Sequence, residues 1–145
     1  MILINNQRIF LDTAFVIALL NRRDKYHDIA KALMDLVRQS PEIWVTEAVL
    51  VEIGNALAST DRQGAADFIN SCYATAHFIV VPGGDNLMKR AIRLYKNRMD
   101  KDWGLTDCIS FIIMQDEGLL LALTTDTHFR QAGFVPLMLE SEDSF

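Results

Sequence analysis

Short apolar runs alternate with longer segments of helical period along the chain. The apolar runs have strand length and predict strands at residues 8–12, 43–46, 77–81, 120–124 and, less regularly, 136–139. The segments between them predict helices at residues 14–21, 25–39, 47–59, 61–73, 86–99 and 106–116. Such alternation is typical of βαβ units, which build a parallel sheet covered on both faces. We therefore predict a three-layer α/β/α fold with four to five parallel strands.

Composition favours one compact domain over residues 1–145, because 145 residues with 50% hydrophobic content can bury a substantial core. No apolar run has the ~18 residues that suggest a membrane span, and the first residues lack the pattern of a secretion signal. We expect a cytoplasmic protein without a membrane segment. Cys72 and Cys108 are then expected as reduced thiols.

Four acids stand where apolar runs meet their neighbours: Asp12, Glu52, Asp107 and Asp126. Asp12 and Asp126 follow predicted strands, and Asp107 begins a predicted helix. In an open α/β fold the ends of the strands and the starts of the following helices gather at one edge of the sheet. We therefore predict that these carboxylates share one cleft.

Each acid also has a structural interpretation. Asp12 could cap a helix, Asp107 could favour a helix start through the exposed amides, and Asp126 could form a turn. Glu52 is harder to explain, because Val49, Leu50, Val51 and Ile53 surround it and its helix is expected to be largely covered. A buried carboxylate there would need a metal ion or a Lys or Arg partner.

Clustered carboxylates predict a metal site. At ~4 Å and an effective dielectric constant of ~20, each pair of charges repels by roughly 4 kcal/mol. An all-oxygen ligand set selects Mg²⁺ or Mn²⁺ over Zn²⁺, and such ions can activate water and stabilise a leaving oxygen at phosphorus. No serine has an obvious His/Asp partner, and His128 is interpreted first as a solvated turn residue, with substrate contact as the alternative.

The net charge is only a weak argument against an RNA substrate if the four acids bind metal. The chain has 19 acids and 14 bases, a formal net charge of −5, which argues against a polyanion. Subtracting the four acids leaves 15 against 14 bases. Candidate phosphate-binding residues are Arg22 and Arg23 after the first helix, and Lys89, Arg93 and Lys96 on the helix at 86–99. An ordinary solvated helix face is an equal alternative for the bases of that helix.

Two features near these bases have alternative interpretations. Trp103 could stack on an unpaired base, although a place in the core or at a dimer contact is favoured. The helix at 86–99 also carries an apolar stripe that is interpreted as core-facing. This stripe consists of Met88, Ile92, Tyr95 and Met99.

The motifs around the acids resemble those of the PIN-domain family, especially the ribonuclease toxins of type II toxin-antitoxin modules. They are FLDTAFVIALL, VEIGNAL, LTDCISFIIM and LTTDTHFRQAGF, which together span most of the chain. The resemblance implies a Mg²⁺- or Mn²⁺-dependent endoribonuclease whose metal site is formed by the four acids. It further implies supporting roles for Thr13, Thr106 and Thr124, frequent homodimers, and an antitoxin partner that inserts a peptide near the acidic cleft.

Other α/β families fit less well. A haloacid-dehalogenase-type phosphatase needs a second Asp where this chain has Ala14, a receiver domain needs a phosphoacceptor where it has VVPGG, and no Gly-x-Gly-x-x-Gly run marks a Rossmann site. The remaining alternative is a non-catalytic PIN-like module that binds RNA or docks a protein and retains its acids for structure.

Overall fold

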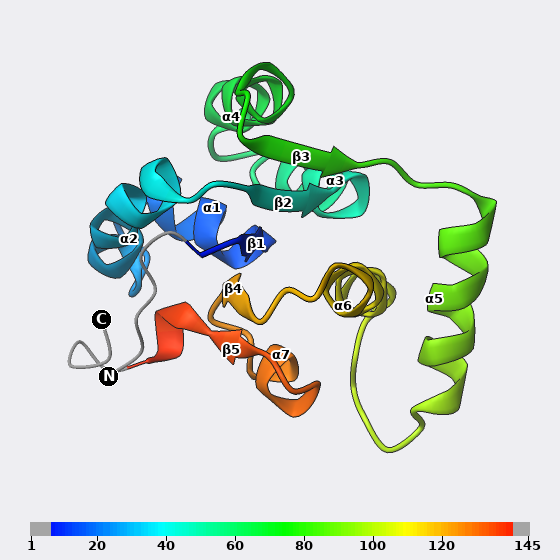
Figure 1. Cartoon of the computed structure of the whole chain (residues 1–145). Coiled ribbons are helices and arrows are strands. Elements are labelled where there is room, and N and C mark those ends of the chain that lie inside the picture. Colours follow the sequence, from blue (N-terminus) through cyan, green and yellow to red (C-terminus); the bar gives the residue numbers. More distant parts are fainter. Residues whose placement is uncertain (1–6, 141–145) are drawn as a thin grey trace.

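The computed structural model describes residues 7–140 and is built around a five-stranded sheet. All strand pairs are parallel, and the order across the sheet is β3-β2-β1-β4-β5 (Figure 1). The strands are β1 (Ile9–Leu11), β2 (Ile43–Thr46), β3 (Phe78–Val81), β4 (Leu121–Leu123) and β5 (Val135–Pro136). This arrangement confirms the predicted α/β fold with a central parallel sheet.

Within residues 7–140, seven α-helices surround the sheet. They are α1 (Thr13–Leu20), α2 (His27–Gln39), α3 (Glu47–Ala56), α4 (Arg62–Ala74), α5 (Asp85–Asn97), α6 (Leu105–Glu117) and α7 (Thr127–Gln131). The chain runs from β1 through β2 to β3 in one direction and reaches β4 and β5 in the other. Because parallel crossovers are right-handed, α1 to α4 lie on one face and α5 to α7 on the other. The contacts agree, since α3 packs on α1 and α4, while α6 packs on α5 and α7.

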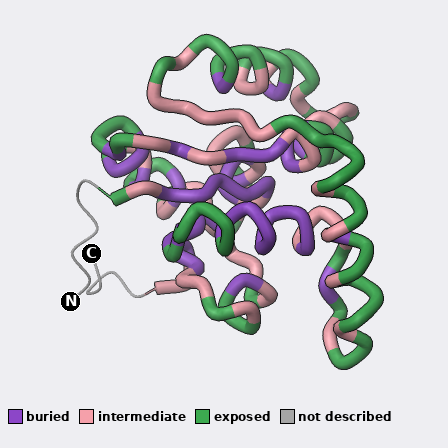
Figure 2. The backbone as a smooth tube through the Cα atoms, turned by 45° about the vertical axis from the view of Figure 1, so that its right-hand side comes forward, coloured by how far each residue is buried: buried purple, intermediate pink, exposed green. Residues whose placement is uncertain are grey.

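The core lies between the sheet and both helical layers. Every residue of β1 and β4 is buried, as are the residues of α6 from Cys108 to Met114 (Figure 2). Phe111 on α6 packs edge-on against Trp103 and Phe129, with ring centroids 4.9 Å and 5.0 Å apart. The two central strands are thus fixed from both sides, which holds the residues at their carboxyl ends in place.

Near the C-terminus of the described chain one predicted strand was wrong and one helix was missed. The strand expected at 136–139 is β5 at Val135–Pro136 followed by a 3₁₀ helix at Leu137–Leu139. The five-residue helix α7 was not predicted, because its one buried residue, Phe129, gives no helical repeat.

The predicted core-facing stripe of α5 was also wrong. The helix packs on α6 through Leu87, Ala91 and Leu94, and Ala91 is fully buried. The stripe itself points outward, with exposed fractions of 41% for Met88, 48% for Ile92, 53% for Tyr95 and 89% for Met99. Figure 2 shows most of α5 exposed at the side of the molecule. An apolar residue count cannot distinguish two such stripes when the buried one includes alanine.

Within residues 7–140, none of the helices is long and apolar enough to cross a membrane. Cys72 and Cys108 are both buried and free, as expected for reduced thiols.

Candidate metal centre at the carboxyl edge of the sheet

The strand order places the candidate residues at a switch point of the sheet. The chain leaves β1 toward β2 on one side and leaves the adjacent β4 toward β5 on the other. Asp12 follows β1 directly, and Asp126 precedes α7 in the segment after β4. Ligands of open α/β proteins bind in the crevice that such a divergence leaves at the carboxyl ends of the strands.

Asp12 is the most buried of the four acids, with an exposed fraction of 6%. Its Oδ2 accepts a hydrogen bond of 2.7 Å from the Thr124 hydroxyl. Burial raises the pKa of Asp12 from 3.8 to about 7; the Thr124 bond opposes this rise, and the negative charges of Asp107 and Glu52 add to it. Although Asp12 occupies the position before α1, its side chain forms no capping hydrogen bond. The capping interpretation of Asp12 is therefore wrong.

Thr124 connects the ends of the two central strands. Its hydroxyl donates to Asp12 and also accepts the backbone N–H of Asp126 at 3.0 Å. The side chain is fully buried, so this hydroxyl has a fixed direction. The contact orients one oxygen of Asp12 and ties it to the segment that carries Asp126.

Asp107, Asp126 and His128 form the second part of the site. His128 Nδ1 lies 3.1 Å from Asp107 Oδ2 and 3.3 Å from Asp126 Oδ1. Each carboxylate also caps a helix: Asp107 accepts the N–H of Gly104 at 3.1 Å, and Asp126 accepts the N–H of His128 at 2.8 Å. Burial raises the pKa of Asp107, against the opposing effects of the Gly104 and His128 bonds. One donor atom from each of Asp107, Asp126 and His128 lies within 4.8 Å of the others.

His128 was missed by the sequence analysis, which favoured a solvated turn residue. The ring instead contacts two of the candidate acids and is only 27% exposed. An ionised carboxylate can only accept, so Nδ1 carries the proton in this arrangement. The imidazole therefore lies within the cluster, and the interpretation of His128 as a solvated turn residue was wrong. The available signal was its position two residues after Asp126.

Glu52 is exposed, which corrects the expectation of a covered helix. Helix α3 buries Val49, Leu50 and Ile53, while Val51 and Glu52 face outward. Its negative charge adds to the rise in the pKa of Asp12. Glu52 does not lie in the group of donor atoms formed by Asp107, Asp126 and His128. Over residues 7–140, Glu52 forms no ion pair with Lys or Arg, nor do the other three acids.

The threonines differ in their surroundings. The Thr13 hydroxyl is buried and has no hydrogen-bond partner in the described part of the chain. Thr106 is half-buried in the first turn of α6, where its carbonyl accepts the Ser110 hydroxyl at 3.0 Å. A buried polar atom without a partner beside Asp12 is the feature expected where a bound ion or its water belongs.

The arrangement fits a divalent cation. Carboxylate oxygens dominate the donor set, no Lys or Arg among residues 7–140 neutralises them, and Asp12 is buried despite repulsion from two other acids. A hard cation bound by oxygen would offset that repulsion. With its proton on Nδ1, the His128 ring uses that nitrogen to contact the carboxylates and orient them, and only Nε2 would be free to bind a metal.

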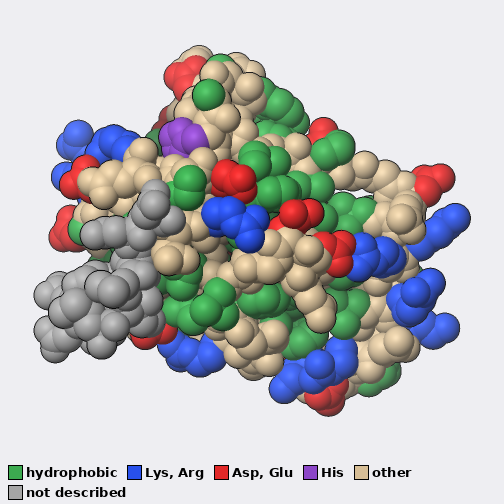
Figure 3. All heavy atoms as spheres, in the orientation of Figure 1, with side chains coloured by type: hydrophobic (Ala, Val, Ile, Leu, Met, Phe, Trp, Pro, Cys, Tyr) green, Lys and Arg blue, Asp and Glu red, His purple; other side chains and the backbone are tan. Residues whose placement is uncertain are grey.

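The candidate substrate contacts are divided between two regions. Lys89, Arg93 and Lys96 are exposed on α5, and Figure 3 shows Lys and Arg side chains gathered along the side of the molecule where α5 lies. Arg22 and Arg23 are exposed between α1 and α2.

Trp103 packs in the core and is poorly placed to stack on a base. It is 6% exposed, and its indole N–H donates to Gln131 at 2.9 Å. Arg98 covers its ring, with the guanidinium carbon 4.8 Å from the centroid. These contacts favour the core interpretation over substrate stacking.

The fold and the acid-lined edge define a class of α/β protein with a candidate divalent-metal site. Residues 9–135 match the model of the PIN domain, and the chain belongs to this family. A search of curated proteins found no significant match.

Two solved structures are similar. VapC20 of Mycobacterium tuberculosis, a sarcin-ricin loop cleaving toxin, is 26% identical with a TM-score of 0.78. FitAcB from Neisseria gonorrhoeae is 17% identical with a TM-score of 0.59, which supports the fold alone. Each similarity covers 88% of this chain and 97% of the other.

Proposed function

We propose that this PIN-domain protein is a metal-dependent endoribonuclease that hydrolyses phosphodiester bonds in RNA. The observation that carries the proposal is the convergence of acids from separate elements with no Lys or Arg neutralising them in residues 7–140. Membership of the PIN family and similarity to VapC20, a sarcin-ricin loop cleaving toxin, support the same activity.

In this proposal Asp12, Glu52, Asp107 and Asp126 hold Mg²⁺ or Mn²⁺. When bound, the ion supplies a nucleophilic water and stabilises negative charge on phosphate oxygens. Thr124 fixes the direction of Asp12 through the 2.7 Å bond. The further supporting roles of Thr13 and Thr106 remain part of the proposal.

His128 has a positioning role in the same proposal. Its Nδ1 forms a hydrogen bond with Asp107 Oδ2 at 3.1 Å and lies 3.3 Å from Asp126 Oδ1. The contact holds two carboxylates that would otherwise repel each other. It thereby limits their movement before a cation arrives.

The test of this activity is metal-dependent cleavage. Purified protein should cut a single-stranded RNA in Mg²⁺ or Mn²⁺ and should stop when EDTA is added. Unchanged cleavage in EDTA would exclude the metal mechanism. Binding of RNA without cleavage under either condition would favour the non-catalytic alternative.

We further propose that the protein is the toxin of a type II toxin-antitoxin module, acting in the cytoplasm as a homodimer with a cognate antitoxin partner. Similarity to VapC20, a toxin, supports this role. The outward apolar stripe of α5 supplies a surface that a protein partner would cover. Expression should halt growth, and co-expression of a small DNA-binding protein encoded next to it should restore growth. Growth unaffected by active protein would contradict the toxin role.

A further inference from the structure

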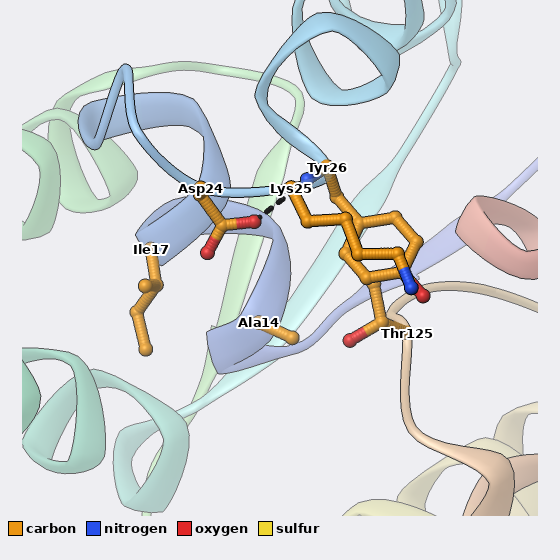
Figure 4. Close-up of a pocket in the computed structure, with 6 residues that line it drawn as sticks. All are labelled: Ala14, Ile17, Asp24, Lys25, Tyr26 and Thr125. Carbon is orange, nitrogen blue, oxygen red and sulfur yellow. Dashed lines mark hydrogen bonds between the residues drawn. The ribbon is translucent and has the colours of Figure 1, made fainter.

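A pocket of about 320 Å³ opens beside the acid cluster, between the start of α1, the loop from α1 to α2, and the segment after β4. Figure 4 shows its lining residues, Ala14, Ile17, Asp24, Lys25, Tyr26 and Thr125. Ala14 lies two residues after Asp12, and Thr125 immediately precedes Asp126. None of the four acids lines the pocket, but two of its lining residues lie within two positions of Asp12 and Asp126 in the chain.

The lining combines a cation, an aromatic ring and a hydroxyl. Lys25 is exposed and forms no ion pair with an acid of residues 7–140. Its ammonium lies 5.2 Å from the centroid of the Tyr26 ring, and in Figure 4 both side chains extend toward Thr125. An ammonium recognises phosphate. The hydroxyl groups of Tyr26 and Thr125 can form hydrogen bonds with a sugar.

The loop that presents Lys25 and Tyr26 is held by local hydrogen bonds. Asp24 Oδ1 accepts the Tyr26 N–H at 2.8 Å, which is the dashed line in Figure 4. At the end of the loop, His27 Nδ1 lies 2.8 Å from the carbonyl oxygen of Ala18 on α1. A loop fixed in this way loses less conformational entropy when a ligand binds.

The size of the pocket limits what it can take. Ligand pockets commonly have volumes of ~300–1,000 Å³, and this one, at about 320 Å³, lies at the lower end. Ala14 and Ile17 provide an apolar wall beside the polar groups. A single nucleotide matches this volume and this mixture of groups, whereas a base-paired duplex would not enter.

The basic region on α5 offers a less suitable surface for RNA. Arg90 is committed to Asp116 through bonds of 2.6 Å and 2.8 Å, and Arg98 to Asp100 through two bonds of 3.0 Å. The remaining bases of α5 are interleaved with the exposed apolar stripe defined above.

We propose that the pocket binds one nucleotide of a single-stranded RNA next to the phosphodiester at the acid cluster. Lys25 contacts a phosphate, and the hydroxyl groups of Tyr26 and Thr125 contact the ribose. This assignment rests on the proposed function for the identity of its ligand. It places the RNA path along the loop between α1 and α2.

The test measures binding in EDTA, where the proposed hydrolysis cannot occur. A fluorescein-labelled 12-nucleotide single-stranded RNA is titrated with the full-length protein at several salt concentrations, and fluorescence anisotropy gives the Kd. Lys25→Met should weaken binding about fivefold to tenfold and should reduce the slope of log K against log salt by about 0.7, the value for one contact to a single strand. Lys25→Arg should retain most of the affinity.

Lys31→Met is the matched control, because Lys31 is exposed on the neighbouring helix α2 and is not among the pocket residues. This variant should bind RNA like the wild type. Equal affinities of wild type, Lys25→Met and Lys31→Met would overturn the assignment, as would failure of the wild type to bind this RNA at all.

A second measurement locates the RNA directly. An RNA of the same length that contains 4-thiouridine is photo-crosslinked in EDTA, and mass spectrometry identifies the attached peptide. Crosslinks within residues 22–31 would support the assignment, and crosslinks confined to α5 would overturn it.

The two proposals can fail separately. RNA binding that depends on Lys25, without cleavage in Mg²⁺ or Mn²⁺, would retain the subsite and remove the nuclease activity. Metal-dependent cleavage with unchanged Kd and KM in Lys25→Met would retain the activity and remove the subsite.

Discussion

The two parts of the acid cluster are built differently. Asp12 is buried at the end of β1, its side chain accepts a hydrogen bond from Thr124, and it forms no helix-capping hydrogen bond. Asp107 and Asp126 are more exposed, each accepts a backbone N–H at a helix start, and both contact His128.

All three acids are proposed metal ligands, but only Asp107 and Asp126 also form hydrogen bonds that stabilise the fold at helix starts. Ionised Asp12 destabilises the metal-free fold, because burial raises its pKa to about 7. Asp107 and Asp126 stabilise helix starts whether or not a metal is bound. Substitutions at the two parts should therefore affect activity and stability in different proportions.

The largest effect is expected from Asp107→Asn. Removing one charged ligand should lower the rate of RNA cleavage by about 10²–10³-fold or more. The fold should survive, because the Asn side-chain oxygen can still accept the Gly104 N–H that Asp107 accepts at 3.1 Å. Cleavage of a fluorescent single-stranded RNA gives the rate, and urea denaturation gives the stability.

The control for Asp107→Asn is Asp67→Asn. Asp67 is exposed on α4 and is hydrogen-bonded only to Gln63 among the described side chains, at 2.9 Å. This substitution should leave the cleavage rate within about twofold of wild type. Full activity of Asp107→Asn would contradict its proposed role as a ligand.

The next effect concerns pH and Asp12 in the metal-free protein. The folded-state pKa is raised from 3.8 to about 7, so the stability associated with protonated Asp12 is fully present below pH 3.8 and is lost as pH rises through about 7. Three pKa units correspond to at most about 4 kcal/mol. Relative to Asp12→Asn, the wild type should therefore become progressively less stable between about pH 4 and 8 in EDTA.

Urea denaturation at several pH values measures this difference. Comparing the two proteins at each pH largely cancels other titrating groups, including Asp107, whose pKa is also raised. Asp67→Asn should follow the wild-type profile. A pH-independent difference between wild type and Asp12→Asn would show that Asp12 ionises without a folding penalty.

Metal binding should offset the destabilisation that ionised, buried Asp12 causes. At an ion concentration ~100-fold above Kd, Mg²⁺ or Mn²⁺ should stabilise the wild type by about 2.7 kcal/mol. For a domain of this size this raises Tm by about 5–10 °C. Asp12→Asn should gain clearly less, and thermal unfolding with and without metal measures both gains. An equal gain in both proteins would place the ion away from Asp12.

The sequence predicted the elements that carry strong periodicity and missed those that do not. The strand at Ile43–Thr46 was predicted at its observed bounds, and the other main strands differ by one or two residues. Alternation of apolar runs is a direct consequence of burial on both sheet faces, so it can be seen in one chain. The exposure of Glu52 and of the α5 stripe depends on which neighbours pack against a helix, and no local pattern contains that information.

The candidate site follows the same division. Asp12, Asp107 and Asp126 could be predicted because topology brings strand ends to one edge. His128 could not, because its place in the cluster depends on how the short helix α7 turns its ring toward Asp107, a residue 21 positions away. The hydrogen bond from Thr124 to Asp12 joins residues 112 positions apart. The family resemblance implied a supporting role for Thr124, but its contact with Asp12 is known only from the fold.

The smallest effect predicted here concerns that link, through Thr124→Val. Valine has nearly the same shape but cannot donate to Asp12 or accept the Asp126 N–H, which are bonds of 2.7 Å and 3.0 Å. Stability at pH 8 in EDTA should fall by about 1–2 kcal/mol, and metal affinity should fall about tenfold because the ligand is no longer oriented. Since the Thr124 bond lowers the pKa of Asp12, its loss should also move the pH-dependent loss of stability above pH 7.

Thr124→Ser retains the hydroxyl and should restore metal affinity, measured by calorimetry, even though it removes a buried methyl group. If valine and serine weaken metal binding equally, packing at the end of β4 rather than the hydroxyl orients Asp12, and the distinction between the two parts of the cluster would have to be redrawn.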